Sequence, residues 1–138
     1  IGIASLALGV GSAAIDFARD YTKEREQFGK KISDFQGIQF MLADSYTEKE
    51  ASRLLTMNAA WLKEGGKQYM QAASMAKLYC SEWANRACYT AIQLMGGAGY
   101  TKEYPLERHA RDARVTSIYE GTSEIQRVII SRELLKDL

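Results

Sequence analysis

The sequence has very few prolines, histidines and cysteines. It contains one proline and one histidine in 138 residues, and so low a proline content is typical of long uninterrupted helices. Its two cysteines, Cys80 and Cys88, fall in one expected helix about 12 Å apart along the axis, which excludes a disulfide between them. Zinc or haem would lack ligands, so we expect no metal site and interpret the cysteines as small buried hydrophobic residues of a reducing compartment.

The sequence also lacks a strong charge of either sign and a run long enough to cross a membrane. Its 18 basic and 17 acidic residues are interleaved and give a net charge of +1, which argues against nucleic acid or a membrane surface as a partner. The uncharged run before Asp16 is shorter than the ~20 residues of a membrane span, and we predict that it forms a buried helix. The composition, 46% hydrophobic and 25% charged, is typical of one globular domain with a core.

Apolar residues recur at spacings of three and four along most of the chain, which predicts an all-α fold. Short turns between four main helices favour an antiparallel four-helix bundle. Between the third and last helices, Pro105 is expected at the first position of a short helix, and residues 115–119 are strand-like. The first main helix is predicted to end near Phe28 and Gly29, and the second to be capped by Ser33 or Asp34 and to end at Gly65 and Gly66. The third is predicted over residues 69–95. The last is predicted to be capped by Thr122 or Ser123, and Ser123 and Gln126 have the spacing of a capping box.

The segment SIYEGTSEIQ, residues 117–126, places Glu120 two residues before the predicted cap of the last helix. The unpaired N–H groups and the dipole of a helix start favour a nearby carboxylate, and helix initiation alone would account for an acid there. Gly121 permits a positive φ and close approach by another molecule, while Tyr119 can exclude water. In a cleft, the dipole would favour the ionised carboxylate and desolvation the protonated one, and the balance between them stays open.

Two other segments are candidates for anion binding, although each has a simpler explanation. In QLMGGAGY, residues 93–100, a helix rather than a strand precedes the glycines, so a helix C-cap explains them better than a dinucleotide loop does. In REQFGK, residues 25–30, a guanidinium, an amide and an aromatic ring can hold a phosphate and stack on a base, but such groups at a helix end are usually only solvated. The arginines at 108, 111 and 114 are expected to form a solvated, ion-paired surface.

The segments REQFGK, FQGIQFMLAD, QLMGGAGYTKEYPLERHARDAR and IYEGTSEIQR occur together, in this order. In this combination the chain resembles the C-terminal all-helical domain of the acyl-CoA dehydrogenases, most of all the short-chain and short/branched-chain type. The resemblance covers essentially the whole chain. It implies that residues 1–138 form a single domain, preceded in a three-domain flavoenzyme by an N-terminal helical domain and a middle β-domain.

The resemblance implies that the enzyme converts an acyl-CoA thioester to the trans-2-enoyl-CoA with FAD as cofactor. Glu120 would abstract the pro-R α-proton while a hydride passes from the β-carbon to flavin N5. The backbone N–H of Glu120 and a ribityl hydroxyl of FAD would stabilise the thioester oxygen. Tyr119 and Gly121 would contact the substrate. Relatives that carry the base on the first helix have another residue at position 120, so Glu120 argues against that variant.

The same resemblance implies two groups of FAD-binding residues. Thr122 and Glu124 would contact FAD within the same active site. The other group would bind the adenosine and pyrophosphate of FAD, typically that of a neighbouring subunit; it consists of Arg25, Gln27, Phe28, Gln36, Gln93, Gly96 and Gly97.

The resemblance further implies a homo-oligomer, a dimer of dimers built largely by these bundles, and electron-transfer flavoprotein as the electron acceptor. The expected role is fatty acid β-oxidation, in the cytoplasm of a bacterium or the mitochondrial matrix of a eukaryote. Acyl-CoA oxidases share the bundle and are a less favoured match. A non-catalytic four-helix scaffold or a nucleotide-binding module remains the alternative, and the length and branching of the acyl group stay open.

Overall fold

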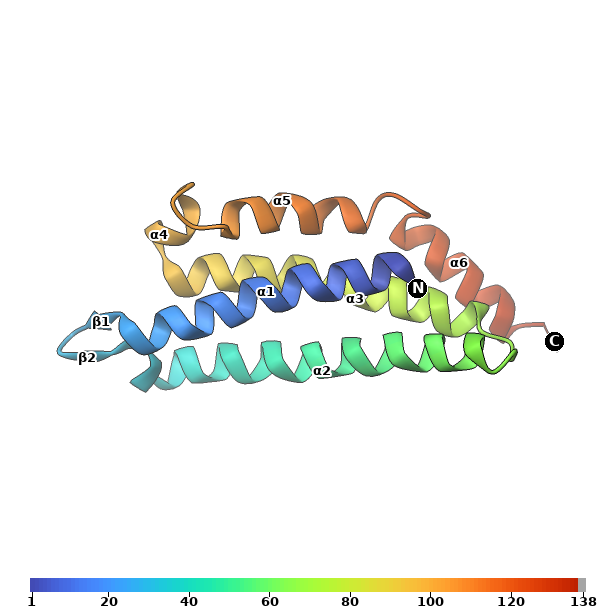
Figure 1. Ribbon diagram of the computed structural model, residues 1–138, viewed down its shortest axis with the longest axis horizontal. Helices are drawn as coiled ribbons and strands as arrows, with labels where there is room; N and C mark the ends of the chain where they lie inside the picture. The colour runs from blue at the N-terminus through green and yellow to red at the C-terminus, as the bar shows by residue number, and fades with distance from the viewer. Residues whose placement is uncertain (137–138) are drawn as a thin grey trace.

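A computed structural model describes residues 1–136, and it shows an elongated helical bundle (Figure 1). The helix α3 lies at its centre and packs against α1, α2, α5 and α6. In Figure 1, α2 runs along one side of the α1–α3 pair, α5 along the other, and α6 crosses the beginning of α3. The prediction of an all-α antiparallel bundle is confirmed. The α-helices of the described residues are α1 (Gly2–Glu24), α2 (Gln36–Glu64), α3 (Met70–Met95), α4 (Gly97–Tyr100), α5 (Leu106–Thr116) and α6 (Ser123–Leu134).

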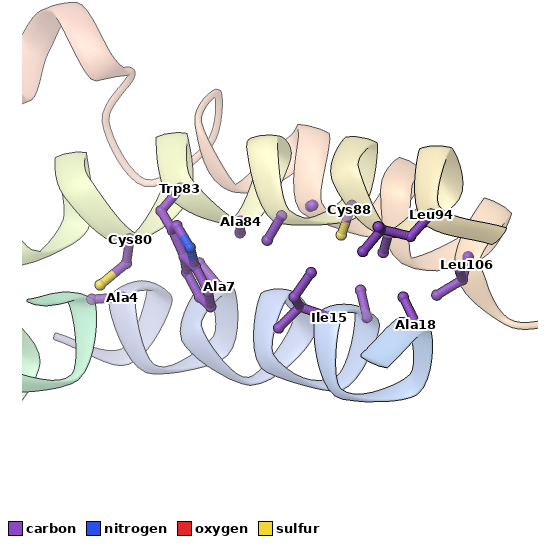
Figure 2. Close-up of a cluster of buried hydrophobic side chains, with 14 of the residues drawn as sticks. Ala4, Ala7, Ile15, Ala18, Cys80, Trp83, Ala84, Cys88, Leu94 and Leu106 are labelled. Carbon is purple, nitrogen blue, oxygen red and sulfur yellow. The ribbon is translucent and has the colours of Figure 1, made fainter. Parts of the chain in front are cut away.

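The core is built on small residues that let α1 and α3 approach closely. On α1, alanines recur at spacings of three, four and seven and are fully buried: Ala4, Ala7, Ala14 and Ala18. Gly11 lies among them on the same face and is also buried. The indole of Trp83 on α3 fills the space opposite this face (Figure 2). A large ring against a stripe of small residues gives the dense packing of a protein interior.

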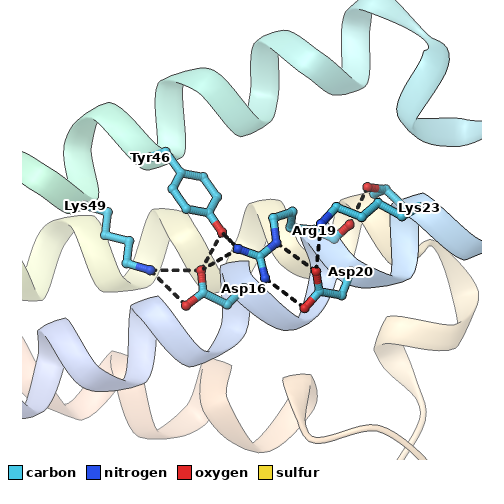
Figure 3. A network of polar contacts seen from close by, with 7 residues as sticks. Asp16, Arg19, Asp20, Lys23, Tyr46 and Lys49 are labelled. Atoms are coloured by element: carbon cyan, nitrogen blue, oxygen red, sulfur yellow. Dashed lines mark hydrogen bonds and ion pairs between the residues drawn. The ribbon is translucent and has the colours of Figure 1, made fainter.

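By length and composition alone, α1 passes the test for a membrane-spanning helix. In the bundle its apolar face packs against α3, and its other face carries a polar network with α2 (Figure 3). Lys49 Nζ donates to both carboxylate oxygens of Asp16 at 2.8 Å, and the Tyr46 hydroxyl also donates to Asp16. Burial alone would raise the pKa of Asp16, but the hydrogen bonds from Lys49 and Tyr46 hold it below its usual value.

The predicted end of the first helix is wrong by about one turn. Helix α1 ends at Glu24, and a small antiparallel hairpin follows, formed by β1 (Glu26–Gln27) and β2 (Lys30–Lys31). Phe28 and Gly29 at its tip have φ values of 55° and 80°. Two successive positive φ values are what a two-residue hairpin turn requires. Gly29 therefore serves a turn and not a helix C-cap.

The other helix boundaries agree with the sequence prediction at the glycine pairs and differ from it at several helix starts. The ends of the second and third helices at the glycine pairs are confirmed. A 3₁₀ turn over Ile32–Asp34 (η1) precedes α2, whose N-cap is Phe35, so the prediction of a Ser33 or Asp34 cap is wrong. Pro105 is the N-cap of α5 and not its first residue, and the strand-like residues 115–119 end α5 and enter a turn. Thr122 caps α6 as one of the two predicted caps.

Candidate active site

The connection between α5 and α6 is a tight loop with an unusual backbone. It spans residues 117–122 and is closed by a 3.1 Å hydrogen bond from the Ser123 N–H to the Ser117 carbonyl. Within it, Glu120 has a φ of 53° and Gly121 a φ of 91°. For Gly121 this conformation carries no steric penalty, whereas for a residue with a Cβ it costs about 1 kcal/mol or more. The surrounding structure must hold Glu120 in this strained conformation.

Side chains from α3 and α6 hold the loop. Lys77 Nζ on α3 donates to the Gly121 carbonyl at 2.7 Å. Gln126 Nε2 on α6 donates to the same carbonyl at 3.1 Å and approaches the Glu120 carbonyl at 3.5 Å. The Ser123 hydroxyl donates to Glu82 on α3. The predicted capping box between Ser123 and Gln126 is therefore wrong, because both side chains are used by other partners.

The start of α6 presents polar groups next to this loop. The Thr122 hydroxyl accepts from the backbone N–H of Ile125 at 3.4 Å, as an N-cap does. Glu124 follows in the first turn and is exposed. Hydrogen bonds from its own backbone N–H and from the Thr122 hydroxyl hold the pKa of Glu124 below its ordinary value. Thr122 and Glu124 therefore lie within four residues of Glu120, on the same helix start.

Glu120 lines a cleft of about 470 Å³ that is formed by three segments of the chain. Its walls come from the beginning of α1, the beginning of α3 and the loop with α6. Most of the lining residues are apolar, and Glu120 is the single carboxylate among those that the described part of the chain contributes. Tyr119 is half-buried next to Glu120 and does not line this cleft. The lining residues are Ile1, Gly2, Ile3, Tyr69, Met70, Ala73, Ser74, Lys77, Glu120, Gln126 and Ile129.

A larger cleft, of about 830 Å³, lies at the other end of the bundle. The end of α1, the hairpin, the beginning of α2 and the end of α3 form it. Six of the seven residues expected to bind adenosine and pyrophosphate line this cleft: Arg25, Gln27, Phe28, Gln93, Gly96 and Gly97. The seventh, Gln36, begins α2 and is exposed beside the lining residues Phe35 and Gly37.

The residues of the larger cleft fit a dinucleotide cofactor such as FAD. The Phe28 ring is 92% exposed at the hairpin tip and meets the Phe35 ring edge-on at 6.2 Å between centroids, so a fixed aromatic face is available to a base. Arg25 supplies a guanidinium, which suits a pyrophosphate. A Cβ at Gly96 or Gly97 would meet nothing within 4 Å, so a ligand can approach the backbone there.

The two clefts are well separated along α3. Lys77 lines the smaller cleft and Gln93 the larger one. These residues are sixteen positions apart in one continuous helix, which at a rise of about 1.5 Å per residue corresponds to about 24 Å. The structure thus brings together the predicted adenosine and pyrophosphate residues, brings together Glu120, Gly121, Thr122 and Glu124, and keeps these two groups apart.

Sequence reasoning missed Lys77 and Gln126. Lys77 falls at the apolar spacing of α3, four residues after Ala73 and three before Cys80. A lysine on the buried stripe of a helix was the available signal, because a charged residue is rarely buried without a partner. Gln126 gave no comparable signal, because its spacing from Ser123 also fits a capping box.

Comparisons with known proteins identify the family of this chain. Residues 1–135 match the family described as acyl-CoA dehydrogenase, C-terminal domain, and the chain therefore belongs to the acyl-CoA dehydrogenase family. It is 53% identical over 136 residues to the caffeyl-CoA reductase–Etf complex subunit CarC of Acetobacterium woodii, covering 99% of this chain and 36% of that protein.

Two solved structures show how closely the fold is shared. Butyryl-CoA dehydrogenase from Megasphaera elsdenii superimposes with a TM-score of 0.96 at 46% identity, over 97% of this chain and 35% of that one. An FAD complex of PigA gives a TM-score of 0.91 at 34% identity, over 95% and 34% of the two chains. The chain spans about a third of the length of the relatives it matches.

Proposed function

We propose that this chain is the base-carrying helical domain of an FAD-dependent acyl-CoA dehydrogenase that acts on a short acyl-CoA thioester. The observation that supports the proposal is the position of Glu120, a carboxylate on a strained turn at the wall of a cleft lined by both apolar and polar residues. Family membership and the likeness to a butyryl-CoA dehydrogenase support the reaction class.

In this proposal Glu120 is the general base. One of its carboxylate oxygens accepts the α-proton of the thioester, and the electrons of that C–H bond move toward the carbonyl carbon. Negative charge then develops on the thioester oxygen, and the Glu120 backbone N–H is the chain's own donor to it. Gly121 has no side chain, and the amide of Gln126 lies where its Cβ would be, so the glycine lets the loop pack closely against α6. Bound FAD supplies the acceptor for the hydride from the β-carbon.

The larger cleft holds the adenosine and pyrophosphate of FAD in this proposal. Arg25 would pair with the pyrophosphate, and the exposed ring of Phe28 would offer its face to the adenine. Thr122 and Glu124 contact the cofactor near Glu120. We expect a homo-oligomer in which each FAD is held by residues of two subunits, as membership of the family suggests. Gln36 completes the set from the start of α2.

The proposal extends to the electron acceptor and the compartment. An electron-transfer flavoprotein is the expected acceptor, and a relative named as part of an Etf complex supports it. A dimer of dimers is the expected assembly. The protein would serve β-oxidation in a bacterial cytoplasm or a mitochondrial matrix.

Anaerobic reduction of the flavin by acyl-CoA tests the proposal in the full-length protein. We expect butyryl-CoA to bleach the flavin absorbance of the wild type. Glu120→Gln is nearly isosteric and cannot accept the proton, so it should bind FAD normally and slow bleaching by about 10²- to 10⁴-fold. Glu103→Gln, an exposed carboxylate in the turn before α5, is the matched control and should behave as wild type.

The outcomes separate the candidate functions. Normal bleaching in Glu120→Gln would place the base elsewhere. If no acyl-CoA of any length or branching bleaches the wild-type flavin, the dehydrogenase proposal fails and the non-catalytic module gains support. A set of straight and branched acyl-CoAs in the same assay identifies the preferred substrate by its rate.

A further inference from the structure

We propose that Lys77 is a positioning residue for the reaction, because its ammonium group fixes the strained turn that carries Glu120. The inference rests on the proposed function of Glu120 and assigns a role to a residue on a different helix. Lys77 and Gly121 are 44 residues apart in sequence and are joined by a 2.7 Å hydrogen bond.

The burial of Lys77 calls for an explanation. The residue is 4% exposed, and burial lowers the pKa of its ammonium group, an effect that the charges of Glu82 and Glu124 partly oppose. Within residues 1–136 no carboxylate forms a salt bridge with Lys77 Nζ. A buried cation without a close ion pair is costly, and a methionine would fill the same volume without that cost. Packing alone therefore does not account for a lysine at this position.

The ammonium group is bonded to a carbonyl whose orientation matters. The direction of the Gly121 carbonyl fixes ψ of Gly121, and Gln126, which donates to the same oxygen, also approaches the carbonyl of Glu120. Together these donors define two successive peptide planes in the part of the loop where φ is positive. A charge-assisted hydrogen bond is roughly twice as strong as a neutral one, so Lys77 is the stronger of the two restraints.

The restraint bears on chemistry because Glu120 and Lys77 line the same cleft. The Glu120–Gly121 peptide plane begins at the Cα that carries the Glu120 side chain, so a shift of this plane, or of the Gly121–Thr122 plane that follows it, would also displace the carboxylate. A displacement of about 1 Å in a catalytic group costs on the order of 100-fold in rate. Loss of the Lys77 ammonium should therefore slow proton abstraction and leave affinity for acyl-CoA nearly unchanged.

The test uses the full-length FAD-loaded protein and compares wild type with Lys77→Met and Lys77→Gln. We expect Lys77→Met to lower the limiting rate of anaerobic flavin reduction by about 10- to 100-fold, with the acyl-CoA Kd within about twofold of wild type. Lys77→Gln keeps a donor and should recover part of the rate. Lys49→Met is the matched control, because it also removes a hydrogen-bonded ammonium from the fold but outside the cleft. It should retain the wild-type rate.

A second readout does not depend on catalysis. In hydrogen-exchange mass spectrometry, Lys77→Met should increase exchange in the peptide covering residues 117–124, and Lys49→Met should leave that peptide protected. If Lys77→Met does not fold, Gln126→Leu removes the weaker restraint on the same carbonyl and should produce the same two changes with smaller amplitude.

The outcomes are distinguishable from failure of the proposed function. A wild-type protein that no acyl-CoA reduces would refute the proposed function, and the exchange experiment would still report on the restraint. An active wild type with unchanged rate and exchange in Lys77→Met would overturn the role of Lys77 alone. A change in Kd without a change in the limiting rate would also overturn it, because it would make Lys77 a substrate-binding residue.

Discussion

Gly11 is the position at which the closeness of α1 and α3 is most directly testable. A Cβ at this residue would lie 2.7 Å from Cζ3 and 3.0 Å from Cη2 of the Trp83 ring, and 3.1 Å from the Cα of Ala84. The Trp83 ring is fully buried, and the Ala84 atom belongs to the backbone. Neither can move aside without moving α3. We therefore expect Gly11→Ala to destabilise the bundle.

The magnitude follows from two opposing effects. Carbon atoms pack best at about 3.5–4.0 Å, so one added methyl group must displace the facing helix by several tenths of an ångström or more. Overpacking of this kind costs about 1–3 kcal/mol. Replacing a mid-helix glycine by alanine gains about 1 kcal/mol in helix propensity. The net loss in free energy of unfolding should be about 0–2 kcal/mol.

Gly9 provides a control that isolates the steric effect. It lies on the exposed face of α1, and a Cβ there would meet nothing within 4 Å. Gly9→Ala should therefore stabilise the protein by about 0.5–1 kcal/mol. Urea unfolding should separate the two variants by about 1–3 kcal/mol. The double variant Gly11→Ala with Trp83→Phe should be more stable than the sum of its single effects, because the smaller ring makes room for the methyl group. Equal stability of Gly9→Ala and Gly11→Ala would refute the close packing described for this interface.

Three further predictions concern stability at high pH, retention of FAD and the N-cap of α6. Burial raises the pKa of the Cys88 thiol to about 12 in the folded protein, whereas the pKa of an unfolded cysteine is about 8.5. Between these two pH values, unfolding releases the thiol proton. The free energy of unfolding should therefore fall by about 1.4 kcal/mol per pH unit in that range. Cys88→Ala should flatten this slope, and identical slopes would contradict the assignment. Arg25→Ala in the full-length protein should lose FAD on dialysis, whereas Lys23→Ala, two residues earlier and outside the larger cleft, should retain it. Equal flavin content in the two variants would count against the role of Arg25. Thr122→Ala should lower the free energy of unfolding, measured by thermal unfolding, by about 1 kcal/mol. Thr122→Ser should lower it much less, because serine keeps the capping hydroxyl. Equal losses in the two variants would show that the hydroxyl does not stabilise the start of α6.

The sequence predicted the bundle well wherever a local pattern is compatible with a single type of structure. Apolar spacing and the glycine pairs located the ends of α2 and α3. The end of α1 was mispredicted because glycine with a positive φ serves both a helix C-cap and a hairpin turn, and local sequence does not distinguish them. The strand-like residues 115–119 form no strand: Val115 and Thr116 end α5, and residues 117–119 enter the turn before α6. β-propensity is realised only against a neighbouring strand, and local sequence does not show whether one is there.

In the candidate site, features that are local in the sequence were predictable, and features that depend on tertiary packing were not. Glu120 was accessible to sequence reasoning because its neighbours, Gly121 and the cap of α6, are adjacent in the chain. Its own positive φ and the contact with Lys77 were not, because they depend on how α3 lies against the loop. A lysine on an apolar helix stripe is compatible with a side chain that reaches to solvent. The fold decides which carbonyl it meets.

The two clefts at the ends of α3 make that helix a fixed spacer. Inserting or deleting one residue between Lys77 and Gln93 would turn one cleft by about 100° relative to the other and shift it by about 1.5 Å. Restoring the phase would take a change of seven residues, about two full turns, and would then misplace the clefts by about 10 Å. The turn before α5 lies outside both clefts and faces no such restriction. Length variation among natural relatives should therefore collect in that turn and be absent from the middle of α3.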